Sequence, residues 1–187
     1  MGGVIRKKRI AIKPRKPFER ERLVSELKLV GDYGLRNKKE LWTIATYAKQ
    51  DKNQAKNLLI TTNKEQFMTE GRALLDRLSK NGMITGVDFN DEDKIRELLK
   101  EVLNFELANY LERRAQTLVH KMGLAQTIHK ARCLITQNQI TIKGRVINKP
   151  GMMIRSENEG YIEINPNSAT HKAKKGRYAK KHGNKEE

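Results

Sequence analysis

One stretch of the chain, residues 111–164, constrains the fold more than any other. Between Arg113 and Arg155 it holds nine Lys or Arg residues, no Asp or Glu, and no Phe, Trp or Tyr. Its apolar residues are still regularly spaced, first at helical intervals and then with strand alternation: Ile128, Ala131, Leu134 and Ile135, followed by Ile140 and Ile142. A core pattern combined with only positive charge on the polar positions predicts a folded module that faces a polyanion.

The charge of the whole chain agrees with this prediction. The 187 residues carry a formal net charge of +17. Residues 1–22 hold nine Lys or Arg against two Glu, and residues 171–187 hold seven against two Glu. Self-repulsion of this size favours a nucleic acid or an anionic membrane as the partner. No apolar run approaches the ~18 residues that span a bilayer, and the N-terminus lacks a signal-peptide core, so we expect a soluble intracellular protein without a membrane partner.

Four regions are predicted along the chain. Residues 1–17 form a basic, extended arm with Gly and Pro punctuation, and residues 166–187 form a basic, disordered tail. Residues 18–110 form a helical RNA-binding domain, and residues 111–165 form the α+β module. No homo-oligomer is expected.

Four helices are predicted in the helical region, at about 18–29, 40–59, 64–80 and 95–111. Gly31 and Gly34 interrupt the chain after the first helix, and Asn81-Gly82 ends the third. Residues 85–93 are acidic and turn-rich, which predicts a loop that caps the fourth helix. The expected apolar faces are Phe18, Leu23, Val24, Leu27 and Val30; then Leu41, Ile44, Ala45, Ala48, Ala55, Leu58 and Leu59; then Phe67, Leu74, Leu75 and Leu78; then Ile95, Leu98, Leu99, Val102, Leu103, Phe105, Leu107, Tyr110 and Leu111.

The module after residue 111 is predicted as two helices against a small, mostly antiparallel sheet, which makes the fold class α+β. One helix ends near Met122-Gly123, and Thr127 caps a second helix over 128–137, with Asn138 at its far end. Strands at 140–142 and 145–147 flank a tight turn at Lys143-Gly144. Further strands are expected at 152–155 and 161–164.

Catalytic and metal-binding patterns were sought and none was found. The single Cys133 excludes a disulfide framework and a cysteine-rich zinc site, and its position predicts a small buried thiol. The four histidines, His120, His129, His171 and His182, show no metal-ligand spacing. Carboxylates at 88–93 are better explained by helix capping than by acid–base catalysis. We therefore expect no enzyme activity, no cofactor and no metal.

The chemistry that is present is that of RNA binding. Modules that read the bases of single-stranded RNA usually stack those bases on aromatic rings. The stretch between Arg113 and Arg155 has no Phe, Trp or Tyr, which favours contacts to the phosphates and 2′-hydroxyls of a folded RNA. The helix start at Thr127 with Lys130 and Arg132 predicts a phosphate site. The candidate RNA-binding residues of the module are Arg113, Arg114, Lys121, Thr127, Lys130, Arg132, Gln137, Lys143, Arg145 and Lys149. Those of the N-terminal part are Arg6, Lys7, Lys8, Arg9, Lys13, Arg15, Lys16, Arg20, Arg22, Arg36, Lys38 and Lys39.

The same residues carry a family resemblance. The run ERRAQTLVHKMGLAQTIHKARCLITQNQITIKGRVINKPGMMI resembles the S4 RNA-binding domain. The positions that match its pattern are Arg114, Gly123, Thr127, Ala131-Arg132 and the hairpin from Ile140 to Gly144. Gln116 stands where many members have Asp, and Lys143 replaces the Asn of the hairpin.

The helical half adds a second resemblance. The segments KPFERERLVSELKLVGDYGLRNKKELW and GRALLDRLSKNGMI are similar to eukaryotic small-subunit ribosomal proteins of the S4 family, and the likeness covers about residues 13–165. The zinc-binding cysteines of some bacterial relatives are missing. This resemblance implies that the protein binds small-subunit rRNA early in assembly and lies near the side where mRNA enters the subunit. The implied partners are that rRNA, neighbouring small-subunit ribosomal proteins and mRNA, and the implied location is the cytoplasmic ribosome, with assembly in the nucleolus.

Three other functions remain open from the sequence. A small nucleolar ribonucleoprotein subunit with the same domain would act in pre-rRNA processing. An RNA-modifying enzyme would need a catalytic domain, and no catalytic set is visible in residues 18–110. The third function is membrane binding through the basic arms.

Overall fold

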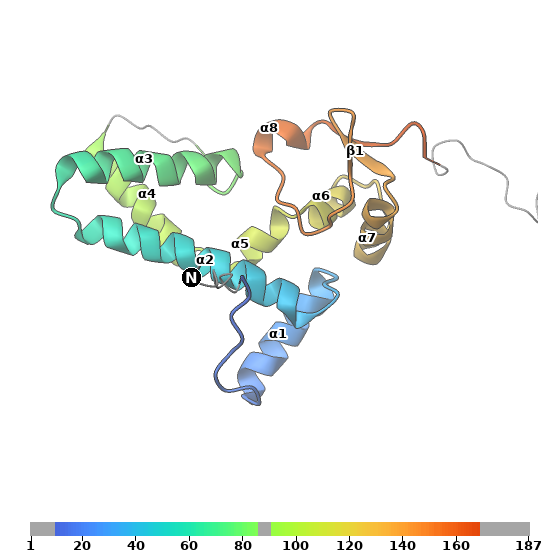
Figure 1. Cartoon of the computed structure of the whole chain (residues 1–187), viewed down its shortest axis with the longest axis horizontal. Coiled ribbons are helices and arrows are strands. Elements are labelled where there is room, and N and C mark those ends of the chain that lie inside the picture. Colours follow the sequence, from blue (N-terminus) through green and yellow to red (C-terminus); the bar gives the residue numbers. More distant parts are fainter. Residues whose placement is uncertain (1–9, 86–90, 169–187) are drawn as a thin grey trace, which may run out of the picture.

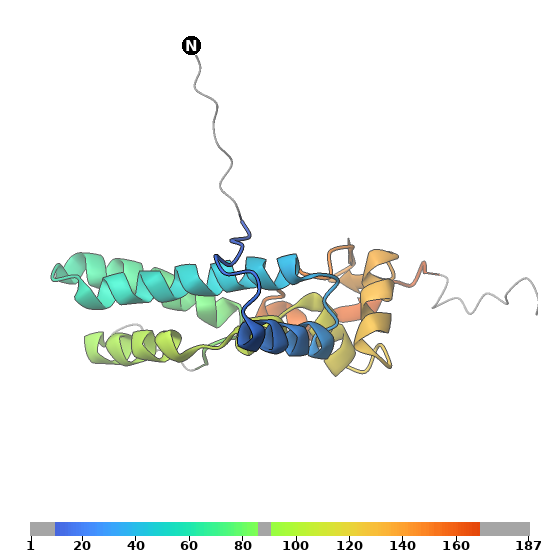
Figure 2. The same ribbon diagram turned by 90° about the horizontal axis from the view of Figure 1, so that it is seen from below.

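The computed structural model of the chain describes residues 10–85 and 91–168. Three long helices form one side of the molecule and the small α+β module forms the other, with α5 (Leu107–Glu112) between them (Figure 1). The turned view shows α2 (Lys38–Ile60) and α3 (Lys64–Lys80) lying above α4 (Glu92–Asn104) (Figure 2). Among the described residues the fold is therefore mostly helical with one small sheet, as the α+β prediction stated.

Side-chain caps and periodic apolar faces account for the long helices. The side chain of Asn37 accepts a hydrogen bond from the Glu40 N–H at the start of α2, and Asn63 accepts from the N–H groups of Glu65 and Gln66 at the start of α3. These three helices enclose one hydrophobic cluster, which confirms the predicted inner face of α3. The buried members are Ala55, Leu58, Phe67, Leu74, Leu75, Leu78, Ile84, Ile95, Leu99 and Val102.

The predicted helix over 95–111 is two helices, so that prediction was wrong in extent. Helix α4 ends at Asn104, and the backbone of Phe105 is extended, with ψ at 130°. The chain then restarts as α5 at Leu107. The break lets the Phe105 ring pack edge-on against Tyr110, with ring centroids 6.5 Å apart. Periodicity could not detect this, since apolar residues continue at helical intervals across the break.

Helix α1 (Arg20–Asp32) packs differently from its predicted apolar stripe. Phe18, Val24 and Leu27 are exposed, by 90%, 60% and 59% respectively. The side of α1 that meets α2 instead carries Glu26, which is buried and accepts a hydrogen bond from Trp42 Nε1 over 3.1 Å. The prediction for these three side chains was wrong, whereas Val30 of the same predicted stripe is partly buried against the cluster of Leu35, Leu41 and Leu111.

A second hydrophobic cluster joins the helical region to the module. Its buried residues are Leu35, Leu41 and Leu111, with Leu29, Val30, Tyr33, Ile44 and Leu107 partly buried around them. Leu111, the first residue of the predicted module, thus packs against α2 and the segment that precedes it.

The module itself follows the predicted plan. Helices α6 (Ala115–Lys121) and α7 (Ile128–Thr136) pack on a three-stranded antiparallel sheet with strand order β2-β1-β3. The strands are β1 (Ile140–Ile142), β2 (Arg145–Ile147) and β3 (Ile162–Ile164), and Ile140 pairs with both Ile147 and Ile164. Lys143 and Gly144 have φ of 48° and 77°, the left-handed conformation of a two-residue hairpin turn.

The core of the module confirms the predicted inner face of α7 at Ala131, Leu134 and Ile135, while Ile128 is partly buried. The remaining buried residues of this cluster are Ala115, Leu118, Val119, Ala125, Ile140, Ile147, Ile154 and Ile162. Cys133 is exposed, so the prediction of a buried thiol was wrong. Ala131, Leu134 and Ile135 fill the inner face of α7, and Cys133 lies outside that face.

No strand forms at 152–155, contrary to the prediction. The segment instead bonds to the residues that open α6: the Ala115 N–H donates to the Met152 carbonyl over 2.8 Å, and the Ile154 N–H donates to the Arg113 carbonyl over 3.2 Å. A short helix, α8 (Ser156–Glu159), follows and had not been predicted.

Most of the two predicted arms, residues 1–9 and 169–187, lies outside the described residues. Residues 10–17 contain no helix or strand, and the Ile12 N–H donates to Thr46 Oγ1 of α2 over 3.4 Å.

Candidate nucleic-acid interface

Two consecutive arginines at the start of the module bind two different helices. The Arg113 side chain donates from Nε to the carbonyl of Asn81, at the end of α3, over 2.8 Å and forms an ion pair with Glu159 over 3.0 Å. The Arg114 side chain is 2% exposed and pairs with Glu40, in the first turn of α2, over 2.8 Å. Both guanidinium groups, which the sequence assigned to RNA, are held by the protein in this structure.

Glu40 binds a second arginine of the module. Arg132, on α7, donates from both terminal nitrogens to the Glu40 carboxylate, over 2.6 Å and 3.2 Å, and also to Gln116 Oε1 over 3.2 Å. Burial acts to raise the pKa of Glu40, but the hydrogen bonds from Arg132 and Arg114 outweigh it, and the pKa lies below its usual value. Arg132 points away from the core of its module, as predicted, but toward a carboxylate and not toward open solvent.

Gln116 extends this contact to the segment between α1 and α2. Its Nε2 donates to the carbonyl of Gly34 over 3.0 Å and to that of Ile128 over 3.1 Å. Gly34 has a φ of 57°, and a Cβ there would lie 2.9 Å from both Gln116 Nε2 and Ile128 Cγ2. Gln116 therefore ties α6 of the module to the segment between α1 and α2 and to the first residue of α7.

Near the start of the chain, Glu26 forms ion pairs with two basic side chains. The predicted RNA-binding residues Arg22 and Lys38 lie 2.8 Å and 3.2 Å from its carboxylate. Burial raises the pKa of Glu26, and the hydrogen bonds of Arg22, Trp42 and Lys38 more than reverse this, so that its pKa is lowered. Arg22 also donates to the carbonyls of Lys16 and Pro17, which fixes the path of the chain into α1.

The remaining predicted residues of the module present their charge on the surface. Lys130 is exposed on the first turn of α7, beside the Thr127 hydroxyl that accepts the Lys130 N–H over 3.2 Å, as predicted for the cap. On the hairpin and after it, Lys143, Arg145 and Lys149 are exposed. None of Lys130, Arg145 and Lys149 forms an ion pair with any residue in the ranges 10–85 and 91–168. Gln137 is exposed and accepts a hydrogen bond from Gln139, and Lys121 lies 3.2 Å from Glu112.

The N-terminal candidates divide in the same way. Exposed side chains are found at Lys13, Arg15, Lys16, Arg20, Arg36 and Lys39. Arg6, Lys7, Lys8 and Arg9 lie outside the described residues.

Two further residues of the hairpin region were missed by the sequence reasoning. Tyr161 is 53% exposed, and the Lys143 ammonium lies 4.7 Å from the centre of its ring. Arg155 is exposed. An exposed aromatic ring beside a cation is a common feature of RNA-binding surfaces. Tyr161 lies six residues beyond Arg155, outside the aromatic-free stretch from which the sequence prediction was made.

Nothing in the described part of the chain forms a metal site. No group of three or more His, Cys, Asp or Glu side chains is close enough to hold a metal ion there. His120 is accounted for by a hydrogen bond between its Nδ1 and the carbonyl of Ala125 at 3.1 Å. None of the helices in residues 10–85 and 91–168 combines the length and the apolarity that a bilayer crossing needs.

The geometry is thus a small helix-and-sheet module. Its exposed Lys130, Arg145 and Lys149 form no ion pair with the described residues, and its inner arginines bind the rest of the protein. A comparison with protein-family models gives this module an identity. Residues 113–159 match the S4 domain, so this part of the chain is an RNA-binding domain.

Proposed function

We propose that the protein is a structural component of the small ribosomal subunit that binds folded small-subunit rRNA. RNA binding itself follows from the S4 domain. The observation that best supports a folded RNA is the set of exposed cations on α7, the hairpin and the residues after it, Lys130, Arg145 and Lys149, which form no ion pair within residues 10–85 and 91–168. Such cations suit phosphates held at fixed positions, whose neutralisation releases counterions and drives binding.

The ribosomal assignment rests on the sequence of the helical half. That half resembles eukaryotic small-subunit ribosomal proteins of the S4 family, S-nine in the older nomenclature, and the GDYGLRN segment is part of the likeness. In the structure this segment holds Gly34, whose carbonyl binds Gln116 of the S4 domain. A segment that joins the two regions in this way supports the use of both on one RNA.

In this proposal the protein acts in subunit assembly and lies near the side where mRNA enters. The expected partners are small-subunit rRNA, neighbouring ribosomal proteins and mRNA, and the expected location is the cytoplasm, with assembly in the nucleolus. The N-terminal cations from Arg6 to Arg20 and those at Arg36 and Lys39 contact the same RNA. No catalytic step is assigned to the protein.

Sedimentation tests the proposal against a small nucleolar ribonucleoprotein subunit. A ribosomal protein persists in the 40S peak and in translating polysomes, and EDTA moves it from polysomes to free small subunits. Confinement of the protein to pre-ribosomal particles would contradict the ribosomal function and favour the nucleolar one. Crosslinking followed by sequencing of the bound RNA identifies the RNA independently of the sedimentation.

A further inference from the structure

An open groove of about 750 Å³ lies beside the hairpin of the S4 domain. One wall is β2 with the residues that follow it, and the other is the segment 152–155, continued by Asn158 of α8. The volume falls in the range of ~300–1,000 Å³ that is usual for small-molecule sites.

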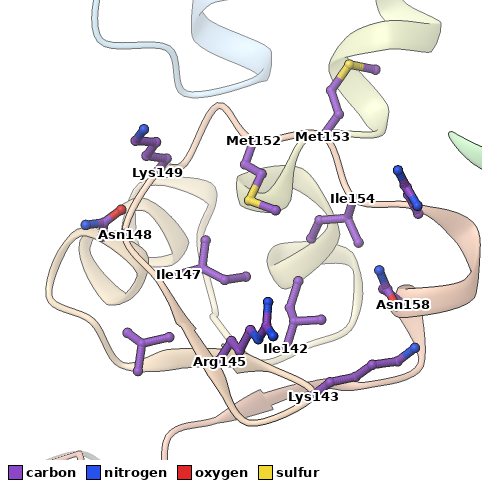
Figure 3. Close-up of a pocket in the computed structure, with 12 residues that line it drawn as sticks. Ile142, Lys143, Arg145, Ile147, Asn148, Lys149, Met152, Met153, Ile154 and Asn158 are labelled. Carbon is purple, nitrogen blue, oxygen red and sulfur yellow. The ribbon is translucent and has the colours of Figure 1, made fainter.

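The lining of this groove combines apolar walls with a cationic rim. Its cations are Lys143, Arg145, Lys149 and Arg155, and no lining residue is acidic. In Figure 3 Met152 reaches in from one side toward Ile147 and Arg145, while Lys143 and Lys149 lie at opposite ends. The apolar part is partly open to solvent, with Met152 47% and Val146 51% exposed.

Phosphate binding alone does not account for the apolar walls. Methionine and aliphatic side chains gain nothing from a phosphate, but they pack well on the face of a flat ring, and a thioether adapts to irregular shapes. The Asn148 and Asn158 side chains, which also line the groove, each offer amide donors and a carbonyl acceptor for a ring edge. The rim cations suit the phosphates on either side of such a ring.

The sheet edge supplies further polar groups. Strand β2 pairs with β1 only, so one side of its backbone is unpaired within the three-stranded sheet. A peptide strand added to this edge is the competing occupant. Strand β2 has only three residues, however, and a rim of four cations suits a polyanion better than a peptide.

We propose that this groove receives one unpaired nucleoside of the bound RNA, with its base against Met152 and Ile147 and its flanking phosphates at Arg145 and Lys149. The proposal rests on the RNA-binding function given above. Bases inside a duplex are stacked and cannot enter, so the groove makes the S4 domain prefer folded RNA that carries an extruded nucleotide.

Two end-labelled RNA hairpins of equal length test this proposal with the full chain. One hairpin is fully paired, and the other carries a single unpaired 2-aminopurine nucleotide in its stem. We expect the second hairpin to bind more tightly by roughly threefold to tenfold in fluorescence anisotropy, with a change in 2-aminopurine emission on binding.

Two variants locate the preference. Met152→Ala removes the apolar contact, and Met152→Gln keeps the length of the side chain while replacing the thioether with an amide. The Met152 side chain is about half exposed, so both variants should fold. Each is expected to lower affinity for the 2-aminopurine hairpin and to leave affinity for the paired hairpin unchanged. Met122→Ala, which truncates another exposed methionine of the S4 domain, is the matched control and should change neither affinity.

Equal affinity for the two hairpins, or a preference that survives both groove variants, overturns the nucleoside site and favours a peptide in the groove. Either result leaves the RNA-binding function standing. A full chain that binds neither hairpin nor rRNA overturns the proposed function, and the groove proposal with it.

Discussion

Single arginines of this protein have roles that their neighbours in the sequence do not share. Arg113 binds the end of α3, Arg114 binds the start of α2, and Arg132 meets the same Glu40 carboxylate as Arg114. Lys130, only two residues before Arg132, is exposed. The arginines that join the helical region to the S4 domain are therefore distinct from the exposed cations that we propose for RNA binding.

Glu40→Gln tests the contact between the helical region and the S4 domain at the carboxylate that binds both Arg114 and Arg132. The substitution leaves the buried Arg114 guanidinium without a counter-charge, and removal of one partner from such a pair typically costs about 3–5 kcal/mol. Because Glu40 is 26% exposed in its side chain, we expect a smaller loss of about 2–4 kcal/mol in the free energy of unfolding, measured with urea. Glu97→Gln, at an exposed position of α4, is the control and should change the free energy of unfolding by less than about 0.5 kcal/mol. Equal effects of the two substitutions would falsify the central role of Glu40.

Lys130→Ala tests the outward charge. Loss of one phosphate contact should lower the slope of log affinity against log salt by about one unit for a folded rRNA fragment. The melting temperature should not change, since Lys130 is exposed and its side chain is not part of the core. Lys80→Ala is the matched control, because its ammonium lies 2.6 Å from Asp76 and is already neutralised. A salt slope that stays the same in Lys130→Ala, or falls equally in Lys80→Ala, contradicts the assignment.

Among the elements, the segment between α1 and α2 connects more of the molecule than its length suggests. Gly34 contacts Gln116 and Ile128, Leu35 is buried with Leu41 and Leu111, and Asn37 caps α2. The cap places Glu40 in the first turn of α2, where it meets the two arginines of the S4 domain.

A pair of glycine substitutions tests this segment. Gly34→Ala places a Cβ 2.9 Å from Gln116 Nε2 at a positive φ, and we expect it to lower the free energy of unfolding by about 2–4 kcal/mol. Gly31→Ala is the control, because it lies within α1 with nothing within 4 Å of the added Cβ, and it should stabilise the protein by up to about 1 kcal/mol. Urea unfolding of both variants gives the comparison. Comparable stabilities would show that the segment does not hold the S4 domain.

The elements also show where sequence patterns succeed. Both strands of the hairpin, its Lys143-Gly144 turn and the Thr127 cap are specified by residues close to each other in the chain, and they were predicted at their observed positions. The break at Phe105 and the bonding of residues 152–154 to the start of α6 depend on partners elsewhere, and both were missed. The exposure of Val24 and Leu27 on α1 was not predicted for the same reason. The side of α1 that meets α2 carries the buried Glu26, whose hydrogen-bond donor Trp42 lies on α2.

At the scale of the whole molecule, the lowered pKa values of the Glu40 and Glu26 carboxyl groups link stability to pH. Glu40 and Glu26 have pKa values below the ordinary 4.5 because their arginine and lysine partners favour the charged form over the opposing effect of burial. Their contribution to stability is complete above about pH 4.5 and is lost as the pH falls through the lowered values. Asp51 acts in the opposite direction, since burial raises its pKa in spite of Arg77 and Tyr110.

We therefore expect the free energy of unfolding to fall as the pH drops below about 4.5 at constant ionic strength. The sharper expectation concerns the difference in free energy of unfolding between the native protein and Glu40→Gln. This difference should shrink as the pH falls through the lowered pKa of Glu40, because protonated Glu40 resembles glutamine. Urea unfolding at each pH measures the difference. If it does not shrink at any pH below about 4.5 at which the protein is still folded, the carboxylate charge of Glu40 is not what stabilises the contact with Arg114 and Arg132.

Local patterns in the sequence predict the α+β class, the hairpin, the capped helix and the excess of positive charge. All of these depend on local periodicity, turn residues and composition. Which cations stay exposed and which pair with carboxylates depends on the three-dimensional fold. Glu40 lies 74 residues from Arg114 and 92 from Arg132, and no local pattern reveals a pairing over that distance. An arginine on a helix looks the same in the sequence whether it meets a phosphate or a buried carboxylate, since only the fold brings the second charge to it.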